Sequence, residues 1–343
     1  MATAYLADSR FDAHTMQGHP EFAGRLVAIR RRMEADGLTG RLLSVEARPA
    51  SDENLLAVHT ARYLELLEGT SRANGIQMMG LDTYVTPRSY EIARLAAGGV
   101  QQVVDAVIKG EAETGLAAVR PPGHHATPSI GMGFCLLNNI AIAARYAQRQ
   151  HGIGRVLIAD YDVHHGNGTQ DAFYADPTVL YISTHQSPLY PGTGMVQDTG
   201  EGEGVGCTIN IPLSPGVGDQ GYARVFEELV IPVARRFSPE LILVSAGFDG
   251  HWDDPLANMR LSLMGYDQLT RTLLALARDL CHGRIVLVLE GGYNLEVLSY
   301  AWANTARALL GDSACIDPLG PAPGPEPSVD QVTSRIRQLH NLT

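Results

Sequence analysis

Carboxylate and imidazole side chains crowd into one short segment, residues 159–170, which reads ADYDVHHGNGTQ. A segment of this composition fits a metal site, a proton relay or a crowded polar turn. In an extended chain, residues i and i+2 point to the same side, so Asp162 and His164 can bind one ion together. A catalytic zinc has three protein ligands and an open position, and Asp249 in SAGFD is the natural third ligand. Because no Cys competes, an Asp–His–Asp set favours an exchangeable divalent ion that serves hydrolysis.

A second pair of histidines, His124 and His125, lies in the segment RPPGHHA. A histidine beside an activated water can act as general base and acid, an effect worth roughly 10²–10⁴-fold in rate. Each imidazole needs a partner that fixes its tautomer, and Asp160 and Asn167 are the nearby candidates. Tyr293, which follows two glycines, can donate a hydrogen bond to a developing oxyanion. Taken one at a time, these residues also fit helix caps, satisfied surface histidines and a buried tyrosine ring.

Five apolar runs precede the polar motifs, and each is nearly continuous, as expected for strands buried on both faces of a parallel sheet. The runs are TGLAAV (114–119), RVLIAD (155–160), TVLYIS (178–183), ELILVS (240–245) and RIVLVLE (284–290). In open α/β sheets, ligands bind outside the carboxyl ends of the strands. His, Asp, Ser or Tyr stands at all five strand ends, and packing alone rarely produces that coincidence. We therefore predict one shared site.

Segments with helical periodicity alternate with these strands and predict an α/β fold, with one mostly parallel sheet and helices on both faces. The clearest helical segments are 20–37, 87–110, 138–150, 222–237 and 266–280. We expect the first 110 residues to fold as helices on the same sheet, so that residues 1–343 form a single catalytic domain. The Pro-rich stretch at 317–328 is predicted to be a linker before a short C-terminal helix.

The composition limits the class of protein. Hydrophobic residues make up 45% of the 343 residues, yet no apolar run approaches the roughly 20 residues that span a bilayer. The net charge of −11 argues against a nucleic-acid partner, because phosphate binding needs clustered Lys and Arg. The four cysteines show no CxxC or disulfide-framework spacing, and the first residues resemble no signal peptide. We therefore expect a cytoplasmic protein without a membrane partner, and leave homo-oligomerisation open.

Six motifs together resemble the zinc-dependent histone deacetylase family, which includes bacterial histone deacetylase-like amidohydrolases and acetylpolyamine amidohydrolases. Their order and spacing are similar to the family's over residues 14–310. The motifs are RPPGHHA, GFCLLNN, DYDVHHGNGTQ, YPGTG, SAGFDGHWDDPL and LEGGYN. The resemblance implies the arginase/deacetylase fold, with the active site at the carboxyl ends of the strands. It also implies hydrolysis of an acyl-lysine peptide or protein, or of an acylated small amine.

The resemblance assigns two kinds of metal ion. It implies one catalytic zinc ion held by Asp162, His164 and Asp249, with His165 outside the ligand set. It also implies one or two structural potassium ions beside the zinc. The potassium ligands would come from Asp160, Asp162, His164, Ser183 and Thr184.

The resemblance also assigns the reaction and the substrate contacts. His124 and His125 would lie beside the activated water, with His125 as the general base, and Tyr293 would stabilise the transition state. The partners of the two histidines would be Asp160 and Asn167, and Asn at the latter position is typical of the class II branch. The acyl-lysine channel and its rim would be formed by Asp82, Gly133, Phe134, Tyr190 and Leu256.

Three other functions remain as alternatives. An acetylpolyamine deacetylase uses the same chemistry, although Leu256 lacks the acid that would attract a second ammonium group. A binuclear manganese ureohydrolase needs bridging carboxylates where this chain has Gly166 and His251. A non-catalytic acyl-ligand sensor would have lost Tyr293 or a zinc ligand, and the chain keeps both.

Overall fold

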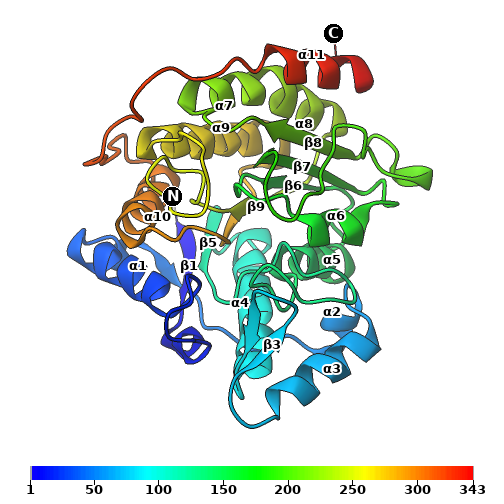
Figure 1. Ribbon diagram of the computed structural model, residues 1–343, viewed down its shortest axis with the longest axis vertical. Coiled ribbons are helices and arrows are strands. Elements are labelled where there is room, and N and C mark those ends of the chain that lie inside the picture. Colours follow the sequence, from blue (N-terminus) through cyan, green and yellow to red (C-terminus); the bar gives the residue numbers. More distant parts are fainter. Residues whose placement is uncertain (1, 343) are drawn as a thin grey trace.

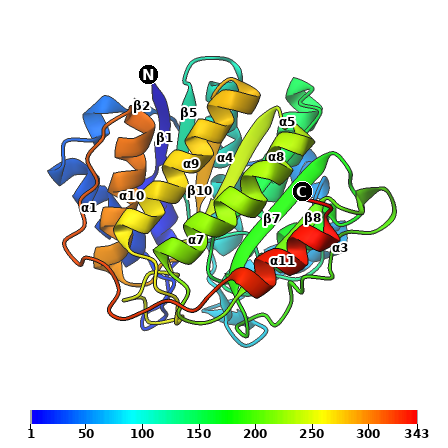
Figure 2. The same cartoon turned by 90° about the horizontal axis from the view of Figure 1, so that it is seen from above.

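The computed structural model describes residues 2–342, and its centre is an eight-stranded sheet in which every pair of neighbouring strands is parallel (Figures 1 and 2). In spatial order the strands are β2 (Leu43–Ser44), β1 (Thr3–Ala7), β5 (Thr114–Ala118), β10 (Ile285–Leu289), β9 (Leu241–Ala246), β6 (Val156–Asp160), β7 (Val179–Gln186) and β8 (Thr208–Leu213). The five predicted strands are confirmed as β5, β6, β7, β9 and β10. Every residue of these five is buried, as the continuous apolar runs require.

Helices cover both faces of the sheet, so the predicted α/β fold class is confirmed (Figure 2). One layer contains α1 (Gly24–Ala35), α10 (Leu295–Leu310), α9 (Leu263–Cys281), α7 (Asp219–Val225), α8 (Ile231–Phe237) and α11 (Asp330–Leu339). The other contains α4 (Ser89–Ile108), α5 (Asn139–His151) and α6 (Asn167–Phe173), with α2 (Asp52–Leu56) and α3 (Ala61–Ser71) outside them. The helical periodicity explains the packing of α9, which buries Leu269, Leu273 and Leu276 on one side.

The expectation that the first 110 residues are helical is wrong in part. They also supply β1 and β2, as well as a small antiparallel pair, β3 (Gln77–Met79) and β4 (Thr83–Val85). These strands are short, and β1 becomes a strand because it pairs with β5 along its full length, a contact that local periodicity does not reveal. The edge strand β8 was not predicted either. It contains Pro212, which an edge position tolerates.

The predicted helix at 222–237 is longer and less regular than expected. It begins at Asp219, and α7 continues into α8 through the π-helical turn Phe226–Val230. The Pro-rich stretch runs across this layer towards α11 (Figure 1). Within it, the Glu326 carboxylate accepts hydrogen bonds from the backbone N–H groups of Gly218, Gln220 and Gly221. The stretch therefore caps the N-terminus of α7.

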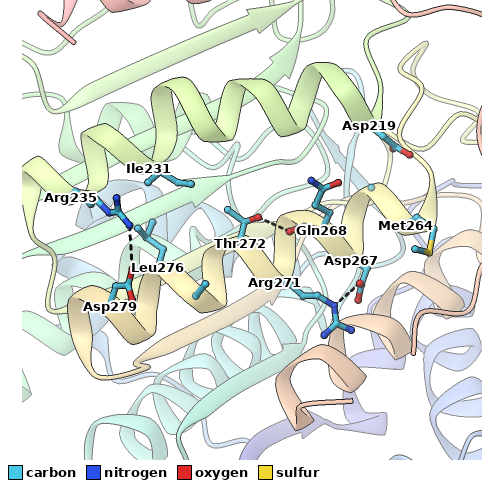
Figure 3. A pocket seen from close by; sticks show the side chains of 12 residues that line it. Asp219, Ile231, Arg235, Met264, Asp267, Gln268, Arg271, Thr272, Leu276 and Asp279 are labelled. Carbon is cyan, nitrogen blue, oxygen red and sulfur yellow. Dashed lines mark hydrogen bonds and ion pairs between the residues drawn. The ribbon is translucent and has the colours of Figure 1, made fainter. Parts of the chain in front are cut away.

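A groove of about 500 Å³ lies between α8 and α9 on the outer side of the helical layer (Figure 3). Four of its charged side chains form two ion pairs, Arg235 with Asp279 at 3.3 Å and Arg271 with Asp267 at 2.6 Å. The fifth, Asp219, accepts hydrogen bonds from the backbone N–H and the hydroxyl of Ser262. The predicted catalytic residues lie elsewhere. Among residues 2–342, no helix has both the length and the apolar character needed to cross a membrane.

Candidate active site

The loops that carry the predicted site residues leave neighbouring strands. The strands β5, β10, β9, β6 and β7 are consecutive in the sheet, and all of them are parallel. Their carboxyl ends therefore meet at one edge, where the residues that follow each strand lie side by side. The fold thus brings together His124 and His125 after β5, Tyr293 after β10, Asp249 after β9, and the segment from Asp160 to Asn167 at the end of β6.

Asp162, His164 and Asp249 form a compact cluster. One ligand-type atom from each residue lies within 4.8 Å of the others. His164 Nδ1 is 3.2 Å from Asp162 Oδ1 and 3.1 Å from Asp249 Oδ2. The second oxygen of each carboxylate accepts a backbone hydrogen bond, from Gly291 N to Asp162 at 2.8 Å and from Val163 N to Asp249 at 3.0 Å. The carboxylates are therefore fixed in orientation while one oxygen of each faces the imidazole.

The electrostatics of this cluster suit a cation. Burial alone would lower the pKa of His164, but hydrogen bonds to Asp162 and Asp249 outweigh it and raise this pKa to about 10. Burial and the neighbouring Asp162 charge raise the pKa of Asp249. Burial also opposes ionisation of Asp162, yet the His124 charge and the contacts with His164 hold its pKa below the ordinary value. Two buried carboxylates thus demand a positive charge between them.

Gly291 is the residue that lets the loop after β10 approach this cluster. A Cβ atom at this position would clash with the carboxylates of Asp249 and Asp162. Only glycine therefore allows the backbone N–H of residue 291 to donate to Asp162.

The two histidines of RPPGHHA have different partners and different charge states. His124 Nδ1 lies 3.1 Å from Asp160 Oδ2, and His125 Nδ1 lies 2.8 Å from Asn167 Oδ1. Burial disfavours the charged form of His124, but the carboxylates of Asp160 and Asp162 raise its pKa to about 10. Burial, together with the charges of His124 and His164, holds the pKa of His125 well below the ordinary value. A neutral His125 that donates from Nδ1 to Asn167 keeps Nε2 free to accept a proton.

Aromatic side chains lie beside His125 and Tyr293. The ring centroid of Tyr190 lies 5.2 Å from that of His125, and the ring of Phe134 lies 5.8 Å from that of Tyr293. Gly133 has a φ of 56°, and a Cβ atom there would clash with the His125 ring. Glycine is therefore required where the Phe134 segment passes over the imidazole.

The two remaining predicted substrate residues have contacts of their own. Asp82 Oδ1 accepts a hydrogen bond from the Thr83 hydroxyl at 2.8 Å and from Gly133 N at 3.3 Å. The hydrogen bond from Gly133 N links the loop between β3 and β4 to the segment that carries Phe134. Leu256 lies on the loop between β9 and α9, partly buried, and its N–H donates to Asp254. Asp82 is therefore joined to the segment of the predicted channel residues Gly133 and Phe134. Leu256 is hydrogen-bonded to Asp254 instead.

His165 and the β7 residues Ser183 and Thr184 complete the predicted site residues. His165 Nδ1 is 2.7 Å from the Thr193 hydroxyl and its Nε2 is 3.2 Å from Gln170, so both ring nitrogens contact residues outside the Asp–His–Asp cluster. Ser183 lies opposite Asp160 in the sheet, and the Thr184 hydroxyl donates to the backbone oxygen of Asp160 at 3.4 Å. The predicted potassium ligands therefore belong to two adjacent strand ends.

Three charged residues of the site were not predicted from the sequence. Glu290 accepts hydrogen bonds from the backbone N–H groups of Gly123 and His124, and burial raises its pKa to about 7. The Arg25 guanidinium lies 5.1 Å from the ring centroid of Tyr293. Asp254 accepts hydrogen bonds from the backbone of the Tyr293 loop. Glu290 has a visible signal, because a charged residue directly after a buried strand is rarely accidental.

The fold and the site agree with the comparisons with known proteins. The chain belongs to the histone deacetylase domain family, whose match covers residues 19–309. Histone deacetylase 14, chloroplastic, of Arabidopsis thaliana is 43% identical over 88% of this chain and 75% of its own length. The human polyamine deacetylase HDAC10 is 42% identical over 84% of this chain and 44% of its own length.

A crystal structure of the HDA15 HD domain superposes with a TM-score of 0.90 at 38% identity, covering 99% of this chain and 94% of the other. These matches confirm the predicted family and fold. The protein is therefore a deacetylase, a hydrolase that acts on amide bonds.

Proposed function

We propose that this deacetylase uses one zinc ion to remove acetyl or other short acyl groups from the Nε atom of lysine side chains. The observation that carries the proposal is the Asp162–His164–Asp249 cluster beside a neutral His125 oriented by Asn167. A three-residue donor set of this kind leaves a coordination position for water or substrate. The buried metal-binding and proton-accepting residues thus fit the hydrolysis of an amide bond, the reaction of the family.

The residues of the cluster fit zinc by their chemistry and by their spacing. Three nitrogen and oxygen donors lie within 4.8 Å of one another, and two buried carboxylates balance a divalent charge. Zinc held by Asp162, His164 and Asp249 would polarise the acyl carbonyl and lower the pKa of a water molecule towards about 7.

The residues around the cluster supply the proton chemistry. His125 accepts the proton of the attacking water at Nε2, because its Nδ1–H is engaged by Asn167. Burial raises the pKa of Tyr293 well above the ordinary value, so its hydroxyl stays protonated and donates to the developing oxyanion. His124, held in its charged form by Asp160, stabilises the negative charge of the site. A protonated histidine then donates its proton to the lysine nitrogen, and the amine leaves as the C–N bond breaks.

The substrate channel follows from the residues that surround His125. Phe134 and Tyr190 would line a narrow passage for the aliphatic part of an acyl-lysine side chain, with Gly133 beside them. Asp82 would contact the substrate backbone at the rim. An apolar Leu256 favours an acyl-lysine over a second ammonium group near the entrance.

A structural potassium ion beside the zinc is the second cofactor that we propose. Its ligands would be Asp160 together with oxygens of Asp162, His164, Ser183 and Thr184. The pairing of Asp160 with Ser183 across β6 and β7 supports this set, because it places oxygen ligands from both strand ends together. We also propose that residues 1–343 act as one catalytic unit. The cytoplasmic location remains a prediction from the sequence, and self-association remains open.

The test of the proposal is the substitution Tyr293→Phe. We expect kcat on a fluorogenic acetyl-lysine peptide to fall roughly 10²–10³-fold, because one oxyanion donor is lost. Bound zinc, measured by elemental analysis, should stay near one ion per chain, and removing it with a chelator should abolish turnover until zinc is restored. Tyr300→Phe, on α10 with its ring packed beneath Arg32 of α1, is the matched control and should leave both readouts unchanged. Near-normal turnover by Tyr293→Phe would refute the assignment.

The same assays distinguish two alternative functions from the proposed one. The similarity to a human polyamine deacetylase favours testing acetylputrescine, and a higher kcat/KM for it than for the peptide would make the polyamine the substrate. A non-catalytic acyl-ligand sensor would bind the acylated peptide without turnover at any zinc concentration.

A further inference from the structure

Asp254 lies on the loop between β9 and α9, five residues after the cluster residue Asp249. The residue is only 6% exposed. Its Oδ2 accepts hydrogen bonds from Tyr293 N at 2.7 Å and from Asn294 N at 3.1 Å, and its Oδ1 accepts one from Leu256 N at 3.1 Å. One buried carboxylate therefore joins the loop after β9 to the loop after β10 through backbone donors alone.

The peptide bond between Gly292 and Tyr293 is held at both of its polar ends. Its carbonyl oxygen, on Gly292, accepts a hydrogen bond from Arg25 Nε at 2.8 Å. Its N–H, on Tyr293, donates to Asp254. Gly292 has a φ of 118°, a conformation that side-chain-bearing residues rarely adopt, so the backbone before Tyr293 has little intrinsic preference for one orientation. Two buried side chains, Arg25 and Asp254, thus fix the plane from which the Tyr293 side chain departs.

The two oxygen atoms of Asp254 matter for this grip. A carboxylate offers two acceptor oxygens, one for the Tyr293 loop and one for Leu256. An amide of the same shape keeps one acceptor and places an N–H₂ donor against one of these backbone N–H groups.

We propose that Asp254 is a positioning residue for the catalytic tyrosine, which it orients by fixing the Gly292–Tyr293 peptide together with Arg25. The inference rests on the proposed role of Tyr293. Asp254 contacts the backbone N–H groups of Tyr293, Asn294 and Leu256, and we infer that its effect on the chemical step passes through the tyrosine. A displacement of about 1 Å at a catalytic group costs roughly 10²-fold in rate.

The test is a double-mutant cycle with Asp254→Asn and Tyr293→Phe in the zinc-loaded enzyme. We expect Asp254→Asn alone to lower kcat by roughly 10–100-fold with little change in KM. In the Tyr293→Phe background, the same substitution should lower kcat by less than about threefold, because the group that it positions is already gone. A further loss as large as in the parent enzyme would overturn the proposal.

Hydrogen exchange gives a readout that does not depend on activity. The amides of Tyr293 and Asn294 should exchange faster in Asp254→Asn, and Asp253→Asn serves as the control because its exposed carboxylate contacts only the side chain of Asn294 within that loop. Unchanged exchange at both amides would also overturn the proposal. If Asp254→Asn fails to fold, the smaller Asp254→Ser variant enters the same cycle. Full activity of Tyr293→Phe would refute the role of the tyrosine, whereas faster exchange would still show that Asp254 holds the loop.

Discussion

The buried carboxylate of Glu21 offers the sharpest test of how charge stabilises this fold. Glu21 is completely buried and forms an ion pair with Arg120, and its Oε1 lies 3.3 Å from Arg25 Nη1. Burial alone would raise the pKa of Glu21, but Arg120 outweighs it and lowers this pKa from 4.5 to about 2. That difference corresponds to about 3 kcal/mol of stability, similar to the roughly 3–5 kcal/mol lost when one partner of a buried pair is removed.

We therefore expect Glu21→Gln to lower the free energy of unfolding at pH 7 by about 3 kcal/mol in a urea titration. Because the folded pKa is depressed, the contribution of Glu21 is fully present above pH 4.5 and is lost as the pH falls towards 2. The difference between parent and variant should thus shrink by about 2 kcal/mol between pH 6 and pH 3, while other acid-sensitive groups affect both proteins.

The matched control is Glu91→Gln, which removes the partner of Arg88 on the surface of α4. We expect a change within about 0.5 kcal/mol, because exposed ion pairs contribute little. A loss below about 1 kcal/mol for Glu21→Gln, or a difference that does not depend on pH, would refute the reasoning.

Three further predictions concern the site and its support. His125→Ala should lower kcat by roughly 10²–10⁴-fold on an acetyl-lysine peptide, because the neutral ring accepts the proton of water. Gly291→Ala should weaken zinc binding by roughly 10–100-fold in competition with a chelator, since its methyl group displaces two ligand carboxylates, whereas Gly69→Ala, which meets no neighbouring atom, should not. Glu326→Gln should lower the free energy of unfolding by about 1 kcal/mol in urea, because α7 loses a charged cap. An unchanged rate, affinity or midpoint would contradict the respective argument.

The parts of the fold that were predictable are those encoded locally. The five central strands are continuous apolar runs, and a parallel strand buried on both faces requires such a run wherever it lies. The proximity of Asp162 and His164 follows from the two-residue period of an extended chain, and the position of Asp249 follows from the convergence of parallel strand ends. In contrast, β1 and β2 are strands because of pairing partners far along the chain, and their own few residues carry no distinctive period.

The charged residues that support Tyr293 show why the rest of the site was not predictable. Arg25 and Gly292 are 267 positions apart, and Asp254 lies 39 positions before Tyr293, so no spacing rule connects them. A rule based on burial fails as well, because Arg and Asp are ordinarily surface residues and only the folded chain reveals that both are covered here. Their positions are nevertheless constrained by one requirement. A loop containing two glycines can place a catalytic hydroxyl reproducibly only if other groups supply the rigidity that the glycines lack. The close approach of Gly291 to two carboxylates and the positive φ of Gly292 demand those glycines, and the need for compensating anchors follows from them.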